Sequence, residues 1–329
     1  MEKALNWTLE EKSLILKYNW KISRNESTSK KNFFIKVSDG ENTGQGEAAP
    51  NIRFGETPET IQEAFKIFRE ENPQTPEGVQ KSCMGLPNAL SFAVESAYIH
   101  YLSTKANLSV SQFLNLPSPV PIATSYTLPI METGEIAAFI KKYNLARFKS
   151  LKLKVNAENA VELTREVAKS STQAIRIDAN EAFKNPDRVL QMLELVKDIN
   201  IAFIEQPFPA TLVDEAIYLK KNSPIEIFAD ESITNNPNWV QIEACFHGIN
   251  MKLMKAGGYY QGIKILQEAK KRNLKTMIGC MVETSLGISS ALNISRLSDF
   301  FDLDGCFIIE QDPFQLIEEK TGMLFLGYE

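Results

Sequence analysis

Histidine and cysteine are scarce in this sequence, and their scarcity excludes several kinds of site. Among 329 residues there are two histidines and four cysteines. The cysteines are widely separated and form no Cys-x-x-Cys pair, which excludes a disulfide-dense fold and a typical zinc site. We expect them to be buried, reduced thiols of a cytoplasmic protein. We expect His100 and His247 to have packing or capping roles, which leaves acid and base chemistry to lysines and carboxylates.

Other missing patterns narrow the partners. No Gly-x-Gly-x-x-Gly or phosphate-loop motif follows a strand-like run, which weakens a nucleotide-binding interpretation. No apolar run approaches the roughly 18 residues of a membrane helix, and the first residues do not resemble a signal peptide. The balance of 36 basic and 41 acidic residues, without a long run of one sign, gives no reason to expect nucleic acid. We therefore expect a cytoplasmic protein with a small-molecule partner and neither a nucleic acid nor a membrane partner.

What the sequence does contain is a repeat. An apolar, strand-like run that ends in one charged residue recurs about every 25 residues, and a helical segment follows each run. The charged residues at these ends are Lys154, Asp178, Glu205, Asp230 and Lys255. This alternation indicates parallel strands joined by helical crossovers. Further strand-like runs at 121–128, 276–280 and 300–304 bring the set to eight, which favours a closed (β/α)8-type TIM barrel over an open sheet.

The first part of the chain has a different pattern. Strand-like runs at 12–18 and 32–37 flank a polar loop, 20–29, and two helices are expected further on, at 57–68 and 88–102. These features predict an α+β capping domain.

A stretch with three prolines, 116–121, is the best linker candidate. We therefore place the capping domain at 1–118 and the barrel domain at 119–305. The last segment, 306–329, has no helix after the eighth strand and is expected to pack back on the capping domain. The barrel is accordingly of the modified (β/α)7β type.

Three of the strand ends carry carboxylates. Because a barrel interior is apolar, charges near it are costly unless they line the catalytic mouth. Asp178, Glu205 and Asp230 would converge there from adjacent strands. Oxygen ligands alone favour magnesium or manganese over zinc. The alternative is three separate salt bridges.

Lysines flank these carboxylates along the chain. Lys152 and Lys154 are two residues apart and project to the same side of a strand. If the strands follow chain order around the barrel, Lys154 and Lys255 lie on opposite sides of the metal. Two bases so placed suit removal of a proton from the carbon next to a carboxylate and its return to the other face. The alternative is a set of solvated strand ends.

Five motifs resemble, in order and spacing, the muconate-lactonizing subgroup of the enolase superfamily. They are Lys152-x-Lys154, Asp178-x-Asn180, Ile204-Glu-Gln-Pro207, Ala229-Asp-Glu-Ser232 and Lys252-x-x-Lys-x-Gly-Gly258. The resemblance implies that the three acids bind magnesium and that Lys154 and Lys255 form the acid-base pair. The lack of a histidine at the corresponding position argues against the mandelate-racemase branch and enolase itself.

The pair Asp302 and Asp304, on the eighth strand-like run, resembles the Asp-x-Asp motif of dipeptide epimerases. In that group the two aspartates hold the free ammonium of a dipeptide. The resemblance therefore implies a magnesium-dependent dipeptide epimerase that inverts the C-terminal residue of a substrate such as Ala-Glu, Ala-Ala or Ala with a hydrophobic residue. An ordinary acidic strand end is the alternative.

Further residues belong to the expected site. Arg24, in the polar loop, is a candidate for binding a glutamate side chain. Other expected substrate contacts are Lys152, Thr127 and Glu283, and residues expected to support the metal ligands and bases are Asn180, Glu231 and Lys252.

Two rival functions remain at this point. o-Succinylbenzoate synthases and N-succinylamino acid racemases use the same lysines and metal, but they have no evident need for paired ammonium-binding aspartates. A noncatalytic binding protein on the same fold is the second rival, although the intact set of bases and acids argues against it. Barrels of this kind often form homo-oligomers, but no stretch of the sequence identifies an interface.

Overall fold

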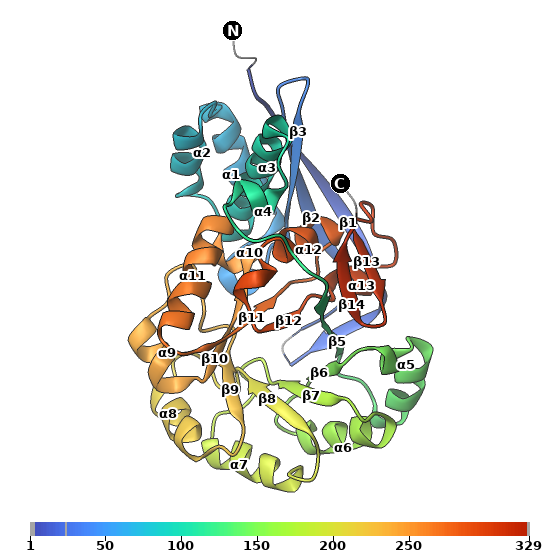
Figure 1. Ribbon diagram of the computed structural model, residues 1–329. Coiled ribbons are helices and arrows are strands. Elements are labelled where there is room, and N and C mark those ends of the chain that lie inside the picture. The colour runs from blue at the N-terminus through green and yellow to red at the C-terminus, as the bar shows by residue number, and fades with distance from the viewer. Residues whose placement is uncertain (1–3, 24, 328–329) are drawn as a thin grey trace.

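Eight parallel strands form the sheet on which the rest of the molecule is built (Figure 1). The computed structural model describes residues 4–23 and 25–327. Spatial order follows chain order through β5 (Ser125–Leu128), β6 (Ser150–Lys154), β7 (Ala174–Asp178), β8 (Ile201–Glu205), β9 (Glu226–Ala229), β10 (Gly248–Lys252), β11 (Lys275–Gly279) and β12 (Phe300–Asp302). Between β12 and β5, Ser125 Oγ donates to Asp302 at 2.8 Å, and the Leu303 amide donates to Thr124 Oγ1 at 2.8 Å. These bonds bring the two edge strands together.

Helices alternate with the strands and cover the outside of the barrel. They are α5 (Ile136–Lys142), α6 (Ala160–Ser170), α7 (Pro186–Leu195), α8 (Val213–Asn222), α9 (Trp239–Cys245), α11 (Tyr259–Lys271) and α12 (Ser285–Asn293). After β12 the described part of the chain has one further helix, α13 (Gly305–Ile308), which is four residues long. The predicted (β/α)7β barrel is confirmed. On β6, Leu151 and Leu153 belong to the main hydrophobic core, whereas Lys152 and Lys154 alternate with them and bind carboxylates.

The cap combines an antiparallel sheet with helices. The sheet has the order β1 (Asn6–Ile22), β2 (Asn25–Ser38) and β3 (Thr43–Ala48), and the helical elements are η1 (Ile52–Phe54), α1 (Pro58–Glu71), α2 (Pro76–Cys83), α3 (Asn88–Ala106) and α4 (Val110–Phe113). The sheet packs directly against α3. A Cβ atom added at Gly44 would lie only 2.0 Å from the Ala97 carbonyl oxygen, which shows how close the two elements are. Figure 1 shows the cap above one end of the barrel.

The prediction of a polar loop over 20–29 is wrong. β1 continues to Ile22 and β2 begins at Asn25, with Trp20 paired to Ser27. Strand pairing uses backbone groups, so polar side chains on both faces do not prevent it. The tip of this hairpin reaches the barrel, where the Ile130 amide donates to the Lys21 carbonyl at 2.9 Å.

The C-terminal segment contacts two parts of the chain. Ile309 forms a bridge with Leu16 of β1. Further on, β13 (Ile317–Lys320) and β14 (Met323–Leu326) form a small sheet with β4 (Ile122–Ala123), which leads into the barrel. The predicted boundary between residues 118 and 119 stays a prediction.

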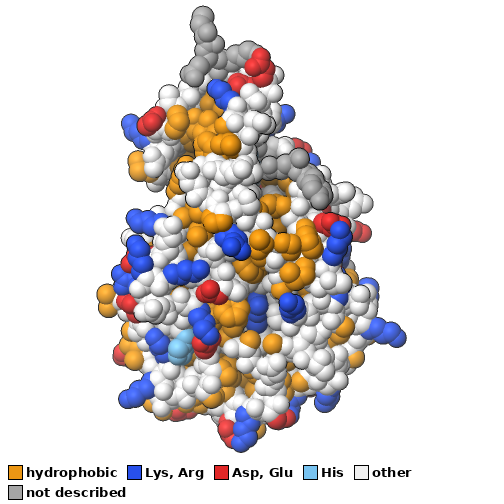
Figure 2. Space-filling model, in the orientation of Figure 1, with side chains coloured by type: hydrophobic (Ala, Val, Ile, Leu, Met, Phe, Trp, Pro, Cys, Tyr) orange, Lys and Arg blue, Asp and Glu red, His pale blue; other side chains and the backbone are white. Residues whose placement is uncertain are grey.

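Surface features agree with the mixed charge of the sequence. Basic and acidic side chains are interspersed over the barrel on the face shown in Figure 2. Within 4–23 and 25–327, no helix is long and apolar enough to cross a membrane.

Candidate active site

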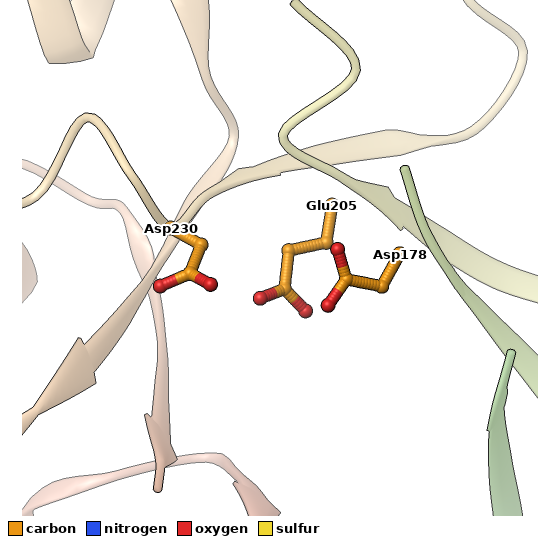
Figure 3. A group of neighbouring side chains, drawn as sticks. All are labelled: Asp178, Glu205 and Asp230. Atoms are coloured by element: carbon orange, nitrogen blue, oxygen red, sulfur yellow. The ribbon is translucent and has the colours of Figure 1, made fainter. Parts of the chain in front are cut away.

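Three carboxylates meet at the C-terminal ends of adjacent barrel strands (Figure 3). Asp178 ends β7, Glu205 ends β8 and Asp230 follows β9 directly. Each of the three is buried and offers an oxygen that lies within 4.8 Å of those of the other two. The parallel ladders set this convergence, since Asp178 pairs in register with Glu205. The structure thus brings together the three residues expected to hold a metal.

Two buried lysines neutralise much of this negative charge. Lys152 Nζ lies 2.9 Å from both Asp178 Oδ2 and Glu205 Oε2. Lys252 Nζ lies 2.9 Å from Asp230 Oδ2. Burial opposes the charged form of Lys152, but Asp178 and its neighbours outweigh it and hold the pKa of Lys152 well above its usual value.

The pKa values of two of the clustered acids, Asp178 and Glu205, are shifted in opposite directions. Burial acts against ionisation of Asp178, but Lys152 and Lys154 lower its pKa to about 2. Burial and the neighbouring charge of Asp178 raise the pKa of Glu205 to about 8. A divalent cation between them would favour the ionised form of Glu205.

The donor set fits a hard divalent cation. Glu205 Oε1 accepts a hydrogen bond from Asn250 Nδ2 at 2.8 Å, whereas the buried Oε2 accepts none from any described residue, although Lys152 Nζ is near. Three buried carboxylates, one with an oxygen whose described contact is an ion pair with Lys152 and not a hydrogen bond, match the oxygen ligation of magnesium or manganese.

The two lysines expected to be bases bind different acids of the cluster. Lys154 Nζ donates to Asp178 Oδ2 at 2.6 Å and to Asn180 Oδ1 at 3.1 Å. Lys255 Nζ donates to Asp230 Oδ1 at 2.5 Å. Since Lys154 ends β6 and Lys255 follows β10, with β7, β8 and β9 between these strands, the two lysines approach the cluster from opposite sides. Burial and the charge of Lys252 lower the pKa of Lys255.

Lys255 does not end a strand, which corrects the sequence-based expectation. β10 ends at Lys252, and Lys255 lies on the four-residue helix α10 (Leu253–Ala256). The helix is capped at its C-terminus by Gly257, whose φ of 84° favours glycine.

The paired aspartates lie beside the same cluster. Asp302 ends β12, and its carboxylate accepts hydrogen bonds from Lys152 Nζ at 2.7 Å and Ser125 Oγ at 2.8 Å. Burial acts to raise the pKa of Asp302, but the larger opposing effect of Lys152 and the other partners leaves this pKa below its usual value. Asp304 was expected on the strand but lies beyond it, where its Oδ2 accepts the Thr127 amide at 2.6 Å. Burial and Asp302 raise the pKa of Asp304 to about 7.

The lysines, Asp230 and the paired aspartates line one cavity of about 460 Å³ between the barrel mouth and the cap, whereas Asp178 and Glu205 are not among its lining residues. The barrel side includes Thr127, Lys152, Lys154, Asn180, Asp230, Glu231, Lys252, Lys255, Asp302 and Asp304. The cap side includes Trp20, Ile22, Asn25, Lys30, Arg53 and Phe54. Asn180 Nδ2 also donates to Glu231 Oε1 at 3.2 Å.

Several expectations have a different outcome. Glu283 is buried outside the cavity lining, and its Oε1 accepts the Met281 amide at 2.7 Å. Arg24 lies outside the described residues. Cys280 was expected to be buried but is partly exposed and lines the cavity. The histidines do not line it, and His100 contacts the Gln45 carbonyl and the Tyr259 hydroxyl at 2.7 and 2.9 Å.

Sequence reasoning missed Lys30. This residue lies on β2 and shares a strand face with Asn32, which also lines the cavity. Burial lowers the pKa of Lys30, and no described carboxylate forms an ion pair with it. The two-residue periodicity that links Lys30 to Asn32 and Phe34 is the available signal, but Lys30 falls between the predicted loop, 20–29, and the predicted strand, 32–37.

Comparisons with known proteins give a consistent result. Residues 135–307 match the family described as enolase C-terminal domain-like. The chain is 34% identical over 303 residues to an L-Ala-D/L-amino acid epimerase of Pedosphaera parvula, with 88% of this chain and 86% of that protein covered. It is 29% identical over 324 residues to a hydrophobic dipeptide epimerase of a Flavobacteria bacterium, with coverage of 94% and 92%.

Solved structures show the same fold. An enolase family member from Agrobacterium tumefaciens, with homology to dipeptide epimerases and bound L-Ala-L-Glu, superposes with a TM-score of 0.90 at 26% identity and covers 98% of each chain. A dipeptide epimerase from Enterococcus faecalis, complexed with Mg and L-Leu-L-Tyr, gives a TM-score of 0.89 at 24% identity, with 99% of this chain and 98% of that chain covered.

Proposed function

The chain belongs to the enolase C-terminal domain-like family, and from this membership we propose that it is a magnesium-dependent dipeptide epimerase. It would invert the α-carbon of the C-terminal residue. The observation that carries the proposal is the placement of Lys154 and Lys255 on opposite sides of a three-carboxylate cluster, in a cavity that also contains a pair of aspartates.

The three carboxylates would hold magnesium through Asp178, Glu205 and Asp230. When bound, the ion supplies positive charge that stabilises the anionic form of the substrate. The relatives support this assignment, since the Enterococcus faecalis protein is described with Mg and a dipeptide.

Lys154 and Lys255 would exchange roles with the direction of the reaction. One lysine, as a neutral amine, removes the α-proton, and the electrons of the broken C–H bond move toward the adjacent carboxylate. The other, as an ammonium, donates a proton to the opposite face of the carbon, so the configuration inverts and the overall charge is unchanged. The lowered pKa of Lys255 favours its neutral form.

The substrate's free ammonium would lie near Asp302 and Asp304. These acids, together with the Thr127 backbone, form a polar end of the cavity. A cation there would favour ionisation of Asp304 and would be held by charge-assisted hydrogen bonds. Succinylated amino acids lack this cation, so the pair favours a dipeptide over an N-succinylamino acid.

The side chain of the inverted residue would face the cap. Trp20 and Ile22 offer apolar surface, and Lys30 offers a cation without a described carboxylate partner. Relatives include both L-Ala-D/L-Glu and hydrophobic dipeptide epimerases. We propose that Lys30 favours an acidic side chain.

The free cysteines support a reducing, cytoplasmic location.

Proton NMR in deuterium oxide with magnesium tests the proposal. Ala-Glu, Ala-Ala, Ala-Leu and N-succinylglutamate are incubated with the protein and with its Lys154→Ala and Lys255→Ala variants. We expect loss of the C-terminal α-proton signal of a dipeptide, formation of the second epimer, and a loss of epimerisation of about 10²- to 10⁴-fold in each variant. Turnover of N-succinylglutamate alone, or full epimerisation by either variant, would contradict the proposal.

A further inference from the structure

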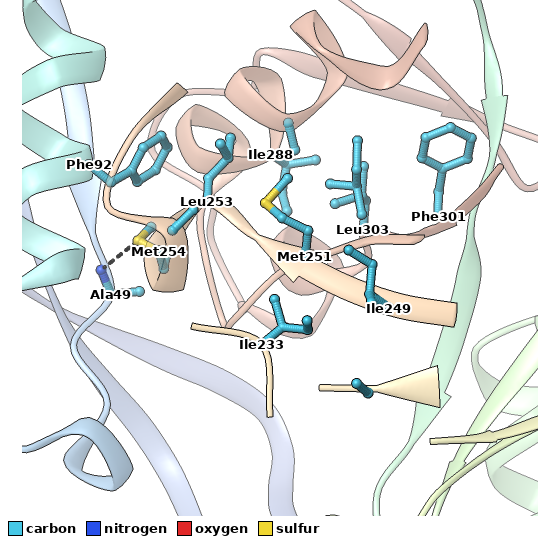
Figure 4. Close-up of a cluster of buried hydrophobic side chains, with 14 of the residues drawn as sticks. Ala49, Phe92, Ile233, Ile249, Met251, Leu253, Met254, Ile288, Phe301 and Leu303 are labelled. Atoms are coloured by element: carbon cyan, nitrogen blue, oxygen red, sulfur yellow. Dashed lines mark hydrogen bonds between the residues drawn. The ribbon is translucent and has the colours of Figure 1, made fainter. Parts of the chain in front are cut away.

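The turn that follows Lys255 is held by the cap. Lys255 lies on α10, and Gly257 and Gly258 connect this short helix to α11. Figure 4 shows Leu253 and Met254 of α10 beside Phe92 of the cap helix α3. The Ala49 amide, also in the cap, donates to Met254 Sδ at 3.4 Å. The support of α10 therefore comes largely from outside the barrel sheet.

Two polar side chains of α3 bind the backbone on either side of the turn. Ser91 Oγ donates to the Gly257 carbonyl at 2.7 Å. Glu95 Oε1 accepts the Tyr260 amide at 3.2 Å, in the first turn of α11. Ser91 and Glu95 are four residues apart and so share one face of their helix. Together they fix the end of α10 and the beginning of α11.

The fit between α3 and this turn is close. A Cβ at Gly258 would lie 2.4 Å from Glu95 Oε1, and a Cβ at Gly257 would lie 3.3 Å from Asn88 Oδ1. The Phe92 and Tyr259 rings also meet, with centroids 6.1 Å apart. The backbone of the turn therefore lies directly against α3. Loss of the Ser91 hydroxyl or of the Glu95 carboxylate would remove a hydrogen bond that holds the turn and would let it move.

The other proposed base, Lys154, is supported by the barrel sheet instead. Lys154 ends β6 and pairs in register with Asp178 of β7, so the barrel sheet itself fixes its backbone. Proton transfer at the two faces of the substrate would thus depend on different parts of the protein, the barrel sheet for Lys154 and the cap for Lys255. A disturbance of α3 would reach the face served by Lys255 and leave the face served by Lys154.

We propose that Ser91 and Glu95 are positioning residues that place Lys255 for proton transfer on one face of the substrate. The proposal rests on the function proposed above. A displacement of about 1 Å at a reacting group can lower a rate about 100-fold, so even two backbone hydrogen bonds have a measurable consequence. The effect is expected on α-proton exchange from one epimer only, because the α-proton of the other epimer would face Lys154.

The test compares Ser91→Ala, Glu95→Gln and Ser96→Ala with the unmodified protein. Ser96 is a matched control, since it is buried on the same helix and its Oγ donates to the Ala93 carbonyl at 3.2 Å, within α3. Each pure epimer of the preferred dipeptide is incubated separately in deuterium oxide, and kcat and KM for α-proton exchange are measured. Lys255→Ala identifies the epimer whose proton faces Lys255.

We expect Ser91→Ala to lower kcat for that epimer by about tenfold relative to the other epimer, with KM and the Ser96→Ala ratio unchanged. Glu95→Gln, which keeps an oxygen acceptor and the shape of the side chain, should have a smaller effect in the same direction and serves if Ser91→Ala does not fold. Amide hydrogen exchange of the segment 253–262 should accelerate in Ser91→Ala but not in Ser96→Ala.

Two results would overturn the inference separately from the function. Equal loss for both epimers would indicate a general structural role, and an unchanged ratio with unchanged amide exchange would show that α3 does not place Lys255. If the unmodified protein exchanges no dipeptide α-proton, the proposed function fails, and the role assigned to Ser91 and Glu95 fails with it.

Discussion

Asp302 and Asp304 share one end of the cavity but have different partners. Asp302 is bound by Lys152 and Ser125, so its negative charge is already compensated. Asp304 accepts a backbone amide from Thr127 and has a raised pKa because it is buried beside Asp302. The two acids therefore differ in what they offer a substrate cation, and Asp304 is the one whose charge an ammonium would stabilise most.

Asp304→Asn removes this charge while its amide oxygen can still accept the Thr127 amide. Since a hydrogen bond to a charged group contributes about 1.5–3 kcal/mol, we expect KM for the dipeptide to rise about tenfold or more. Magnesium affinity should be unchanged, because Asp304 is not one of the clustered ligands. Steady-state kinetics and a magnesium titration measure both, with Asp312→Asn as the control. An equal loss of magnesium affinity would contradict the assignment.

Among the elements, the β1–β2 hairpin contributes several of the side chains that line the cavity on the cap side. Successive residues of β2 face opposite sides, so Lys30 lines the cavity while Lys31 pairs with Glu11 on the sheet. The neighbouring lysines therefore form a natural pair for comparison.

Lys30→Met should change which dipeptide is preferred. If Lys30 binds an acidic side chain, the ratio of kcat/KM for Ala-Glu to that for Ala-Leu should fall about tenfold or more, as expected for a lost hydrogen bond to a charged group. Lys31→Met should leave the ratio unchanged. Competition assays with both dipeptides measure it. A ratio that stays constant in Lys30→Met would show that another residue reads the side chain.

The elements also show which features the sequence could predict. Parallel strands are buried on both faces, so a charged residue at the end of an apolar run is conspicuous in the sequence. The positions of Asp178 and Glu205 could therefore be predicted from the sequence. α10 was not, since a four-residue helix shows no helical periodicity and its apolar residues continue the pattern of β10. The direction of Glu283 was likewise hidden, because a backbone turn after β11 sets it.

At the scale of the whole molecule, the clustered acids link metal binding to stability. A ligand that binds only the folded state stabilises it by about 2.7 kcal/mol at 100 times its Kd. We therefore expect magnesium to raise Tm in a saturable manner and a chelator to reverse the rise. Glu205→Gln should lose most of this response, whereas the exposed Glu310→Gln should keep it. Thermal unfolding at several magnesium concentrations measures the difference, and equal responses in both variants would contradict the site.

Glu283 provides a separate link between stability and pH. Burial and the nearby Glu47 raise its pKa to about 8 in the folded protein, compared with about 4.3 in an unfolded chain. Between these values the folded state holds a proton that the unfolded state has released. Its contribution to stability is therefore complete below about pH 4 and is lost as pH rises through about 8.

Glu283→Gln resembles the protonated acid in shape and carries no titrating group. We expect the free energy of unfolding of the unmodified protein to fall, relative to this variant, by up to about 1.4 kcal/mol per pH unit between about pH 5 and 8. The other buried acids titrate in both proteins, so the difference reports the titration of Glu283 together with its coupling to Glu47. Urea unfolding at pH 5, 6.5 and 8 measures it, with Glu310→Gln as the control. Parallel pH profiles for the unmodified protein and Glu283→Gln would mean that Glu283 is already ionised in the fold, and that its contact with the Met281 amide and its surroundings compensate a buried charge.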